Sequence, residues 1–396
     1  MGQDYAYYKS TFEGRMKPFA FVDLDAFDAN IKAIHKRAGK MPICVASKSV
    51  RCVSLIQRIQ AHSNQFHSIM AFSVREAVYL ASHGLDHILV AYPVFSEVEP
   101  SGLCYSLASG TTITLMIDAV EHIHHLEAIA AQAEVVIPVC IDVDMSSDFP
   151  GVHFGVRRSG ITTPDHALTL WKAIEQCPHV KLRGVMGYEA QIAGVQDRAP
   201  GKAIEGAIIR FMKKRSIPEL RKRRAAVVEA LNNAGAELAF VNGGGTGSIE
   251  STIEEAVVTE VTAGSGFYSP TLFDHYDQFK HKPAAGFALE IVRRPLENTF
   301  TCHGGGYIAS GAPGWDRIPT PFLPEGAALL KMEGAGEVQT PIEYTGPEQL
   351  GIGDPVFFRH SKAGELCERF KTLLLVSKGK VVDEVNTYRG DGQCFL

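Results

Sequence analysis

The sequence predicts an α/β protein in which a (β/α)8 barrel of the TIM type is followed by a smaller all-β C-terminal domain. In the first two thirds of the chain, short runs rich in β-branched residues alternate with longer segments whose apolar residues recur every three or four positions. Eight such strand–helix pairs favour a closed barrel, with an eight-stranded open sheet as the structural alternative. The expected barrel strands are 43–48, 69–73, 88–92, 112–118, 136–144, 182–189, 238–247 and 260–266.

The pattern changes after about residue 275, where short apolar runs are separated by Gly and Pro without helical periods between them. Such a pattern is typical of an all-β module. The stretch 18–25 precedes the barrel and is expected to add a strand to this module, before a helix over 27–39 leads into the barrel. The expected organisation is an N-terminal segment 1–25 that packs with the β domain, a barrel over 26–275 and a β domain over 276–396.

Composition restricts the class of protein. The 396-residue chain is 45% hydrophobic and 21% charged, as soluble globular proteins are, and its net charge of −5 argues against nucleic acid as the main partner. We expect no membrane partner, because no apolar run reaches about 18 residues and the N-terminus lacks an apolar signal stretch. The eight cysteines are scattered without a C-x-x-C pair and indicate free thiols in a reducing cytoplasm.

One dense basic run covers residues 213–238. Ser216 and Glu219 have the spacing of a capping box, and the apolar residues that follow recur at helical spacing. We therefore interpret the run as the solvated face of an amphipathic helix that begins near Ser216, with a phosphate-rich partner as the alternative.

Barrel enzymes carry their reactive groups at the carboxyl ends of the strands. The first expected strand, in PICVASKSVRC, ends on Lys48, for which a surface position is the alternative interpretation. The fifth ends with Asp142 and Asp144, which we favour as loop-capping carboxylates rather than catalysts, and the sixth ends at Tyr188-Glu189.

Two glycine-rich turns follow the seventh and eighth strands, GGGTG at 243–247 and GSG at 264–266. Glycines let successive backbone N–H groups turn towards an anion, and phosphate sites recur at this place in barrels. A phosphate cup and a strand-end lysine at one barrel mouth together suggest pyridoxal phosphate, whose aldehyde forms a Schiff base with lysine and whose ring stabilises a substrate carbanion. The predicted phosphate-binding residues are Gly244, Gly245, Thr246, Gly264, Ser265 and Gly266.

The order of the motifs resembles the fold-type III pyridoxal phosphate enzymes, in which an alanine racemase-like barrel precedes a β domain, and within them the D-threonine aldolase and D-serine dehydratase branch. The resemblance implies that Lys48 is the Schiff-base lysine and a base. It also implies that Arg158 lies near the phenolic oxygen of the cofactor, and Tyr188 near its ring or ring nitrogen. A surface ion pair for Arg158 and a place in the barrel core for Tyr188 are the alternatives. The motifs that carry the resemblance are FVDLDAFDANI, VASK, RSG at 158–160, LRGVMGYE, GGGTG, TAGSG and VVDEVNTYRG.

The same resemblance implies a divalent metal, zinc or manganese, held near the C-terminus by a His-x-Cys or His-x-Asp pair. His360 fits this pattern, but Lys362 stands two residues later and cannot bind a metal while it is protonated. Three interpretations stay open. His360 and Cys367 share the metal in a remodelled loop, or the Lys362 ammonium replaces the metal and polarises the β-hydroxyl, or His360 only caps a strand.

The resemblance thus implies an enzyme that acts on D-configured amino acids with a β-hydroxyl, by aldol cleavage or by dehydration, with Lys48, His360 and Lys362 as candidate catalytic residues. An amino-acid racemase is the alternative within the enzymes, with Tyr307 or Tyr388 as its second base. A non-catalytic pyridoxal phosphate carrier is the alternative outside them. Relatives of this kind pair into homodimers, so a homodimer is expected.

Overall fold

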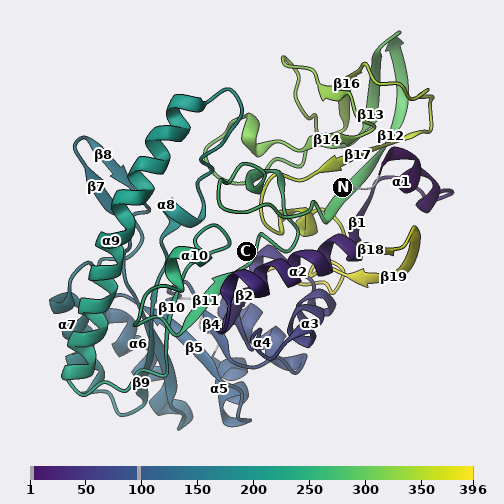
Figure 1. Ribbon diagram of the computed structural model, residues 1–396. Helices are drawn as coiled ribbons and strands as arrows, with labels where there is room; N and C mark the ends of the chain where they lie inside the picture. The colour runs from purple at the N-terminus through teal and green to yellow at the C-terminus, as the bar shows by residue number, and fades with distance from the viewer. Residues whose placement is uncertain (1–3, 96–99, 396) are drawn as a thin grey trace.

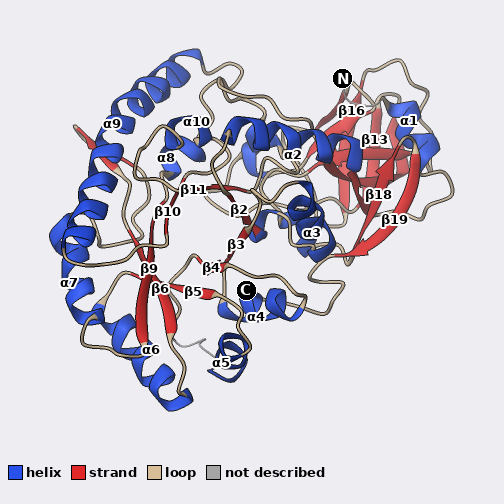
Figure 2. Cartoon of the chain, turned by 60° about the horizontal axis from the view of Figure 1, so that its bottom comes forward, coloured by secondary structure: helices blue, strands red, loops and turns tan. Residues whose placement is uncertain are grey.

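The computed structural model describes residues 4–95 and 100–395. In this part of the chain eight parallel strands close into a barrel in the order β10-β11-β2-β3-β4-β5-β6-β9 (Figure 2). Each predicted strand is confirmed, and the closure shows that the open-sheet alternative is wrong. The barrel strands are β2 (Ile43–Ala46), β3 (Ser68–Ala71), β4 (Ile88–Val90), β5 (Ile113–Ile117), β6 (Ile137–Asp142), β9 (Val180–Gly187), β10 (Phe240–Gly243) and β11 (Glu260–Ala263).

Helices surround the barrel on its outside, and their apolar faces form one continuous core with the strands (Figures 1 and 2). A second, small apolar cluster fills the inside of the barrel around Leu89, Met116 and Met186. None of the helices in the described ranges is long and apolar enough to cross a membrane. The helices of this region are α2 (Leu24–Ala38), α3 (Val53–His62), α4 (Val74–Ser82), α5 (Pro100–Ala108), α6 (Val120–Ala133), α7 (Pro164–Ile174), α8 (Ala190–Ala193), α9 (Ala203–Asn233) and α10 (Ile249–Thr252).

The basic run belongs to α9, and two expectations about it are wrong. The helix does not begin near Ser216 but runs through it, with Pro218 inside, because it already starts at Ala203. Nor is the run wholly solvated, since Arg224 has no exposed surface and pairs with Glu189 and Glu255. A buried arginine needs such partners, because an unpaired charge is strongly destabilising away from water.

The second module is a nine-stranded sheet at the upper right of Figure 1. The first strand of the chain lies in it, with Phe21 opposite Gly286 on one side and opposite Leu374 on the other. The expected boundaries between the N-terminal segment, the barrel and the β domain, after residues 25 and 275, stay predictions. The sheet contains β1 (Phe19–Asp23), β12 (Ala285–Leu296), β13 (Thr299–His303), β14 (Thr320–Leu323), β15 (Ala327–Leu329), β16 (Gln339–Tyr344), β17 (Pro355–Arg359), β18 (Thr372–Ser377) and β19 (Lys380–Asn386); outside it lie helix α1 (Tyr5–Thr11) and the hairpin β7 (Ser147–Phe149) and β8 (Val152–Phe154).

The segment after β17 packs directly on the turn that follows β2. The thiol of Cys367 lies 3.3 Å from the carbonyl oxygen of Val50 and donates to it, and Arg51 forms an ion pair with Glu368 at 2.6 Å. Gly364 lies so close that an added Cβ would be 2.9 Å from the carbonyl oxygen of Lys48. The backbone that carries Lys48 is therefore held by the β module as well as by the barrel.

Replacing Gly364 with alanine tests this contact. Gly364→Ala is expected to lower the free energy of unfolding by about 1–3 kcal/mol, as overpacking of a filled site does. Denaturant unfolding measures it. Gly351→Ala is the matched control, because an added Cβ there meets nothing nearer than an Asp354 carboxylate oxygen at 3.8 Å. Equal stability of the two variants would contradict the close packing.

Candidate active site

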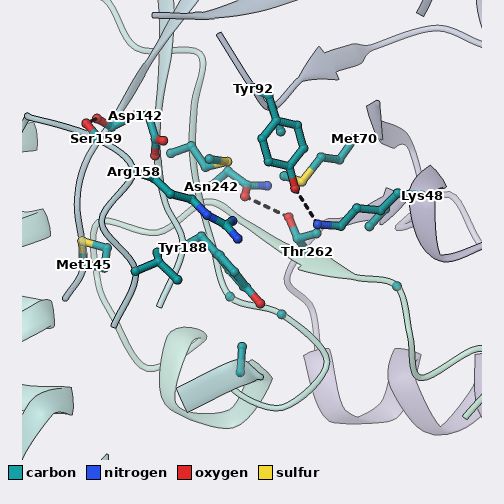
Figure 3. Close-up of a pocket in the computed structure, with 18 of the residues that line it drawn as sticks. Lys48, Met70, Tyr92, Asp142, Met145, Arg158, Ser159, Tyr188, Asn242 and Thr262 are labelled. Carbon is teal, nitrogen blue, oxygen red and sulfur yellow. Dashed lines mark hydrogen bonds between the residues drawn. The ribbon is translucent and has the colours of Figure 1, made fainter. Parts of the chain in front are cut away.

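A cavity of about 490 Å³ opens at the carboxyl ends of the barrel strands, a size typical of small-molecule sites. Figure 3 shows Lys48, Arg158 and Tyr188 pointing into the same space from different strand ends. Gly266, the last residue of the GSG turn, is not among the lining residues. The predicted site residues that line the cavity are Lys48, Arg158, Tyr188, Gly244, Gly245, Thr246, Gly264 and Ser265.

Lys48 leaves the barrel in a short 3-10 turn, Ser47–Ser49, directly after β2. Arg51 Nε donates to the Lys48 carbonyl oxygen at 3.0 Å and fixes the turn. At the other end of the side chain, Nζ donates to the hydroxyl of Tyr92 at 2.5 Å. Lys48 is thus a cavity lysine, and the surface interpretation is wrong.

The two glycine-rich turns form one cup beside the lysine. Thr246 Oγ1 accepts from the backbone N–H groups of Gly264 and Gly266, at 3.3 and 3.1 Å, and so joins the turns. Gly264 has no room for a side chain, since a Cβ would lie 2.6 Å from Ser49 Oγ on the lysine turn. In the described part of the chain, the backbone N–H groups of Thr246 and Ser265 have no hydrogen-bond acceptor. These free donors suit the oxygens of a phosphate.

A single carboxylate beneath the cup holds it in place. Glu189, which follows β9 and is 2% exposed, accepts from the Gly244 N–H at 3.2 Å and from Ser248 Oγ at 3.1 Å. It also accepts from Thr252 Oγ1, and its charge is balanced by Arg224 Nη2 at 2.9 Å. The cup is thereby fixed to the strand that carries Tyr188.

The two aspartates near the end of β6, Asp142 and Asp144, differ in their surroundings. Burial, with Asp118 and Asp144 adding repulsion, raises the pKa of Asp142 to about 7. Asp144 instead accepts from the backbone N–H and the hydroxyl of Ser146, at 2.9 and 3.0 Å. Both aspartates line the cavity, and the loop-capping interpretation fits Asp144 because of its bonds to Ser146.

Arg158 and Tyr188 both occupy the cavity wall. No carboxylate in residues 4–95 or 100–395 forms an ion pair with Arg158, so its guanidinium is available to an acidic ligand, and the contacts do not support the surface ion-pair alternative. Burial, reinforced by Tyr92, raises the pKa of Tyr188 to about 12 and keeps its phenol neutral.

The residues expected to hold a metal are not gathered around a common point. His360 Nε2 pairs with the Ala363 carbonyl oxygen at 2.7 Å, and the Cys367 thiol points to the Val50 carbonyl oxygen. Burial raises the pKa of Cys367 to about 12, and its thiol proton is held in the hydrogen bond to the Val50 carbonyl oxygen. Nowhere in residues 4–95 and 100–395 do three His, Cys, Asp or Glu side chains form a group that could hold a metal ion.

Lys362 lies in a second, small pocket together with His360, Glu365 and Tyr307. Its Nζ donates to Ser310 Oγ at 2.7 Å and lies 3.7 Å from a Glu365 carboxylate oxygen. Tyr388, the other tyrosine considered as a second base, is buried and donates to Glu76 at 2.9 Å. It is therefore committed to a structural hydrogen bond.

Sequence reasoning missed several polar residues of the cavity, among them Tyr92, Asn242 and Thr262. Tyr92 contacts Lys48, and Thr262 Oγ1 donates to Asn242 Oδ1 at 2.9 Å on the cavity floor (Figure 3). Tyr92 is the last residue of the third expected strand, 88–92. Because reactive groups of barrel enzymes lie at the carboxyl ends of the strands, the reasoning that singled out Lys48 applies to Tyr92 as well. The sequence does not single it out, because an aromatic residue fits the apolar pattern of a strand equally well.

Comparison with known proteins adds independent information. The family model described as the alanine racemase N-terminal domain matches residues 22–271. The curated 3-hydroxy-D-aspartate aldolase of Paracoccus denitrificans (strain Pd 1222) is 25% identical over 258 residues, which cover 63% of this chain and 59% of that protein. The D-threonine aldolase of Arthrobacter sp is 23% identical over 250 residues, 63% of this chain and 60% of that protein. The chain thus matches about three fifths of the length of these relatives.

Solved structures share the fold over a greater length. D-threonine aldolase from Filomicrobium marinum superposes with a TM-score of 0.79 at 19% identity, over 95% of both chains. D-threo-3-hydroxyaspartate dehydratase from Delftia sp. HT23 gives a TM-score of 0.74 at 17% identity, over 97% of this chain and 99% of that one. The likeness therefore includes the β module as well as the barrel.

The buried carboxylate beneath the cup provides a stability test. Glu189→Gln is expected to cost about 3–5 kcal/mol in the free energy of unfolding, because it leaves the Arg224 charge short of a buried partner. Denaturant melts measure the loss. Glu254→Gln is the control, since Glu254 forms an exposed pair with Arg221 and such pairs contribute about 0–1 kcal/mol. Similar losses in the two variants would show that the Glu189 network does not hold the cup.

Proposed function

The chain belongs to the alanine racemase N-terminal domain family, and we propose that it is a pyridoxal phosphate-dependent lyase of D-configured 3-hydroxy amino acids. The observation that carries the proposal is the Lys48 amine in one cavity with a cup of free backbone N–H groups. The names of its relatives, 3-hydroxy-D-aspartate aldolase and D-threonine aldolase, support this substrate class.

The residues present fit the cofactor at both of its ends. Thr246 and Ser265 would hold the phosphate through their backbone N–H groups, and the absence of a side chain at Gly264 lets this turn approach the lysine turn closely. Lys48 stands across the cavity as the amine that the cofactor requires. When bound, pyridoxal phosphate supplies an aldehyde that condenses with amines and a ring that withdraws electrons from the α carbon.

Three side chains of the protein supply what the reaction needs besides the cofactor: a proton carrier, a cation and a neutral phenol. Lys48 takes or returns a proton at the α carbon, because its Nζ is the amine directed into the cavity. Arg158, without an ion-pair partner in the described ranges, is the cation placed to meet the phenolic oxygen of the cofactor or the carboxylate of the substrate. Tyr188, a neutral phenol on the cavity wall, would pack against the cofactor ring and exclude water from it.

The substrate's β-substituent would meet the β-module side of the site, where Lys362 is the candidate. Its segment lies beside the cavity, since the backbone N–H of Thr271 donates to His360 and Phe273, two residues further on, lines the cavity. Ser310 and Glu365 hold the ammonium in place without burying it. The contacts of His360 and Cys367 do not fit a divalent ion, so Lys362 is the cation that we assign to an oxygen on the β carbon.

Assembly and location are part of the proposal. We infer a homodimer from the family alone. All eight cysteines lie in the described ranges, none of them forms a disulfide there, and seven are buried, which suits the reducing cytoplasm that we propose as its location.

Purified protein tests the proposed activity. With pyridoxal phosphate it should show the yellow absorbance of a lysine-bound cofactor. Lys48→Ala should abolish this absorbance, whereas Lys32→Ala on the exposed face of α2 should not. Incubation with D-threonine or 3-hydroxy-D-aspartate should release glycine with acetaldehyde or glyoxylate if Cα–Cβ cleavage occurs, and D-serine should give pyruvate and ammonia if dehydration does. A protein that never turns yellow would overturn the proposal, and α-proton exchange without either product would point to a racemase.

Metal content tests the assignment of Lys362. Protein purified without added metal is expected to contain far less than one equivalent of zinc or manganese by elemental analysis, and its activity should resist dialysis against a chelator. Lys362→Asp restores the His-x-Asp pattern of the resembled branch and is expected to increase ion binding. Stoichiometric zinc in the unmodified protein would contradict the assignment.

A further inference from the structure

Tyr92 stands at the end of β4 with its hydroxyl 2.5 Å from Lys48 Nζ. Its ring packs on Met70 and the small apolar cluster inside the barrel, so the position of the hydroxyl is set by the barrel core. Figure 3 shows the phenol above the cavity, directed at the lysine. No other hydrogen bond of this hydroxyl is present in the described part of the chain.

A phenol is an unusual choice of partner for a lysine, and its chemistry differs from that of a carboxylate. A carboxylate only accepts, and at contact distance its attraction for an ammonium, about 4 kcal/mol at a protein surface, would keep the amine charged. A tyrosine hydroxyl both donates and accepts. It can therefore hold Nζ whether the lysine is an ammonium or an amine.

We propose that Tyr92 is the proton-sharing partner of Lys48, a positioning residue that keeps Nζ over the cofactor site in both protonation states. In the exchange, an N–H bond of the ammonium breaks as an O–H bond forms on the phenolate oxygen, so the pair passes between ammonium–phenolate and amine–phenol without a change in net charge. This inference rests on the proposed role of Lys48 and deepens it.

The charges around the pair favour this exchange. Burial raises the pKa of Tyr92, but the Lys48 ammonium, its hydrogen bond and the Arg158 guanidinium outweigh burial, so the pKa lies below its usual range. Asp142, at the end of β6 two strands away in the barrel, opposes this shift, and Tyr188 faces Tyr92 as a second phenol. The two cations thus stabilise the phenolate form that accepts the lysine proton.

Titration of the apoprotein tests the pair without cofactor or substrate. The ultraviolet absorbance of phenolate should show one tyrosine that ionises below the others. Tyr92→Phe should remove this step, and Lys48→Met should move it to higher pH. Tyr105→Phe is the matched control, because Tyr105 is 76% exposed and lies outside the cavity.

Addition of pyridoxal phosphate then measures the consequence. Tyr92→Phe should slow the appearance of the lysine-bound absorbance by roughly 10²-fold near neutral pH, the low end of what a positioned proton acceptor contributes, with a smaller deficit at alkaline pH. In turnover, kcat should fall with KM little changed.

Two outcomes would overturn the inference: cofactor uptake by folded Tyr92→Phe at the wild-type rate and pH dependence, or a wild-type titration with no displaced tyrosine. The second needs no Tyr92 variant to fold. A displaced tyrosine in a protein that cleaves none of the substrates would support the pair and reject only the lyase.

Discussion

A negative charge buried beneath the cup determines much of the architecture around it. Glu189 has almost no contact with water, so each of its oxygens needs donors from the protein itself. It obtains them from α9 through Arg224, from the glycine turn through Gly244, and from the two ends of α10 through Ser248, which precedes the helix, and Thr252, its last residue. The position of three separate elements is thus tied to one carboxylate, and movement of any of them leaves a charge or a donor unpaired.

The turn that carries Lys48 is held in place in a different way. It is held mainly by contact between two modules, with Gly364 against the Lys48 carbonyl and Arg51 paired with Glu368. The cup of glycine turns is held by buried electrostatics, whereas the lysine turn is placed by packing. Since Gly264 meets Ser49 of the lysine turn, the two halves adjoin directly, and a ligand that spans them is bound by a surface already formed.

Much of the fold and of the site was predictable, because both depend on the periodicity of the apolar residues and on the position of polar residues at strand ends. Strands alternate with helices at recognisable spacing, and groups at the carboxyl ends of parallel strands converge, so Lys48 and the glycine turns could be placed together. Arg224 could not, because helical periodicity treats an arginine as exposed unless a distant acid accounts for it, and Glu189 lies 35 residues away in the chain. The loop after β17 could not be predicted for a related reason, because the Cys367 thiol is directed at the Val50 carbonyl, 317 positions earlier in the chain, while His360 pairs with the Ala363 carbonyl inside its own loop.

The segment from His360 to Glu368 has two roles, and different residues of the segment carry them. Its backbone and its buried side chains clamp the lysine turn, and these contacts allow little change. The ammonium of Lys362, in the same segment, bonds to Ser310 and Glu365, and within the described ranges it makes no hydrogen bond to the lysine turn. A substitution at position 362 can therefore change the charge beside the cavity while the contacts that place Lys48 stay intact. The group offered to a ligand and the position of the lysine are thus set by different residues of one segment.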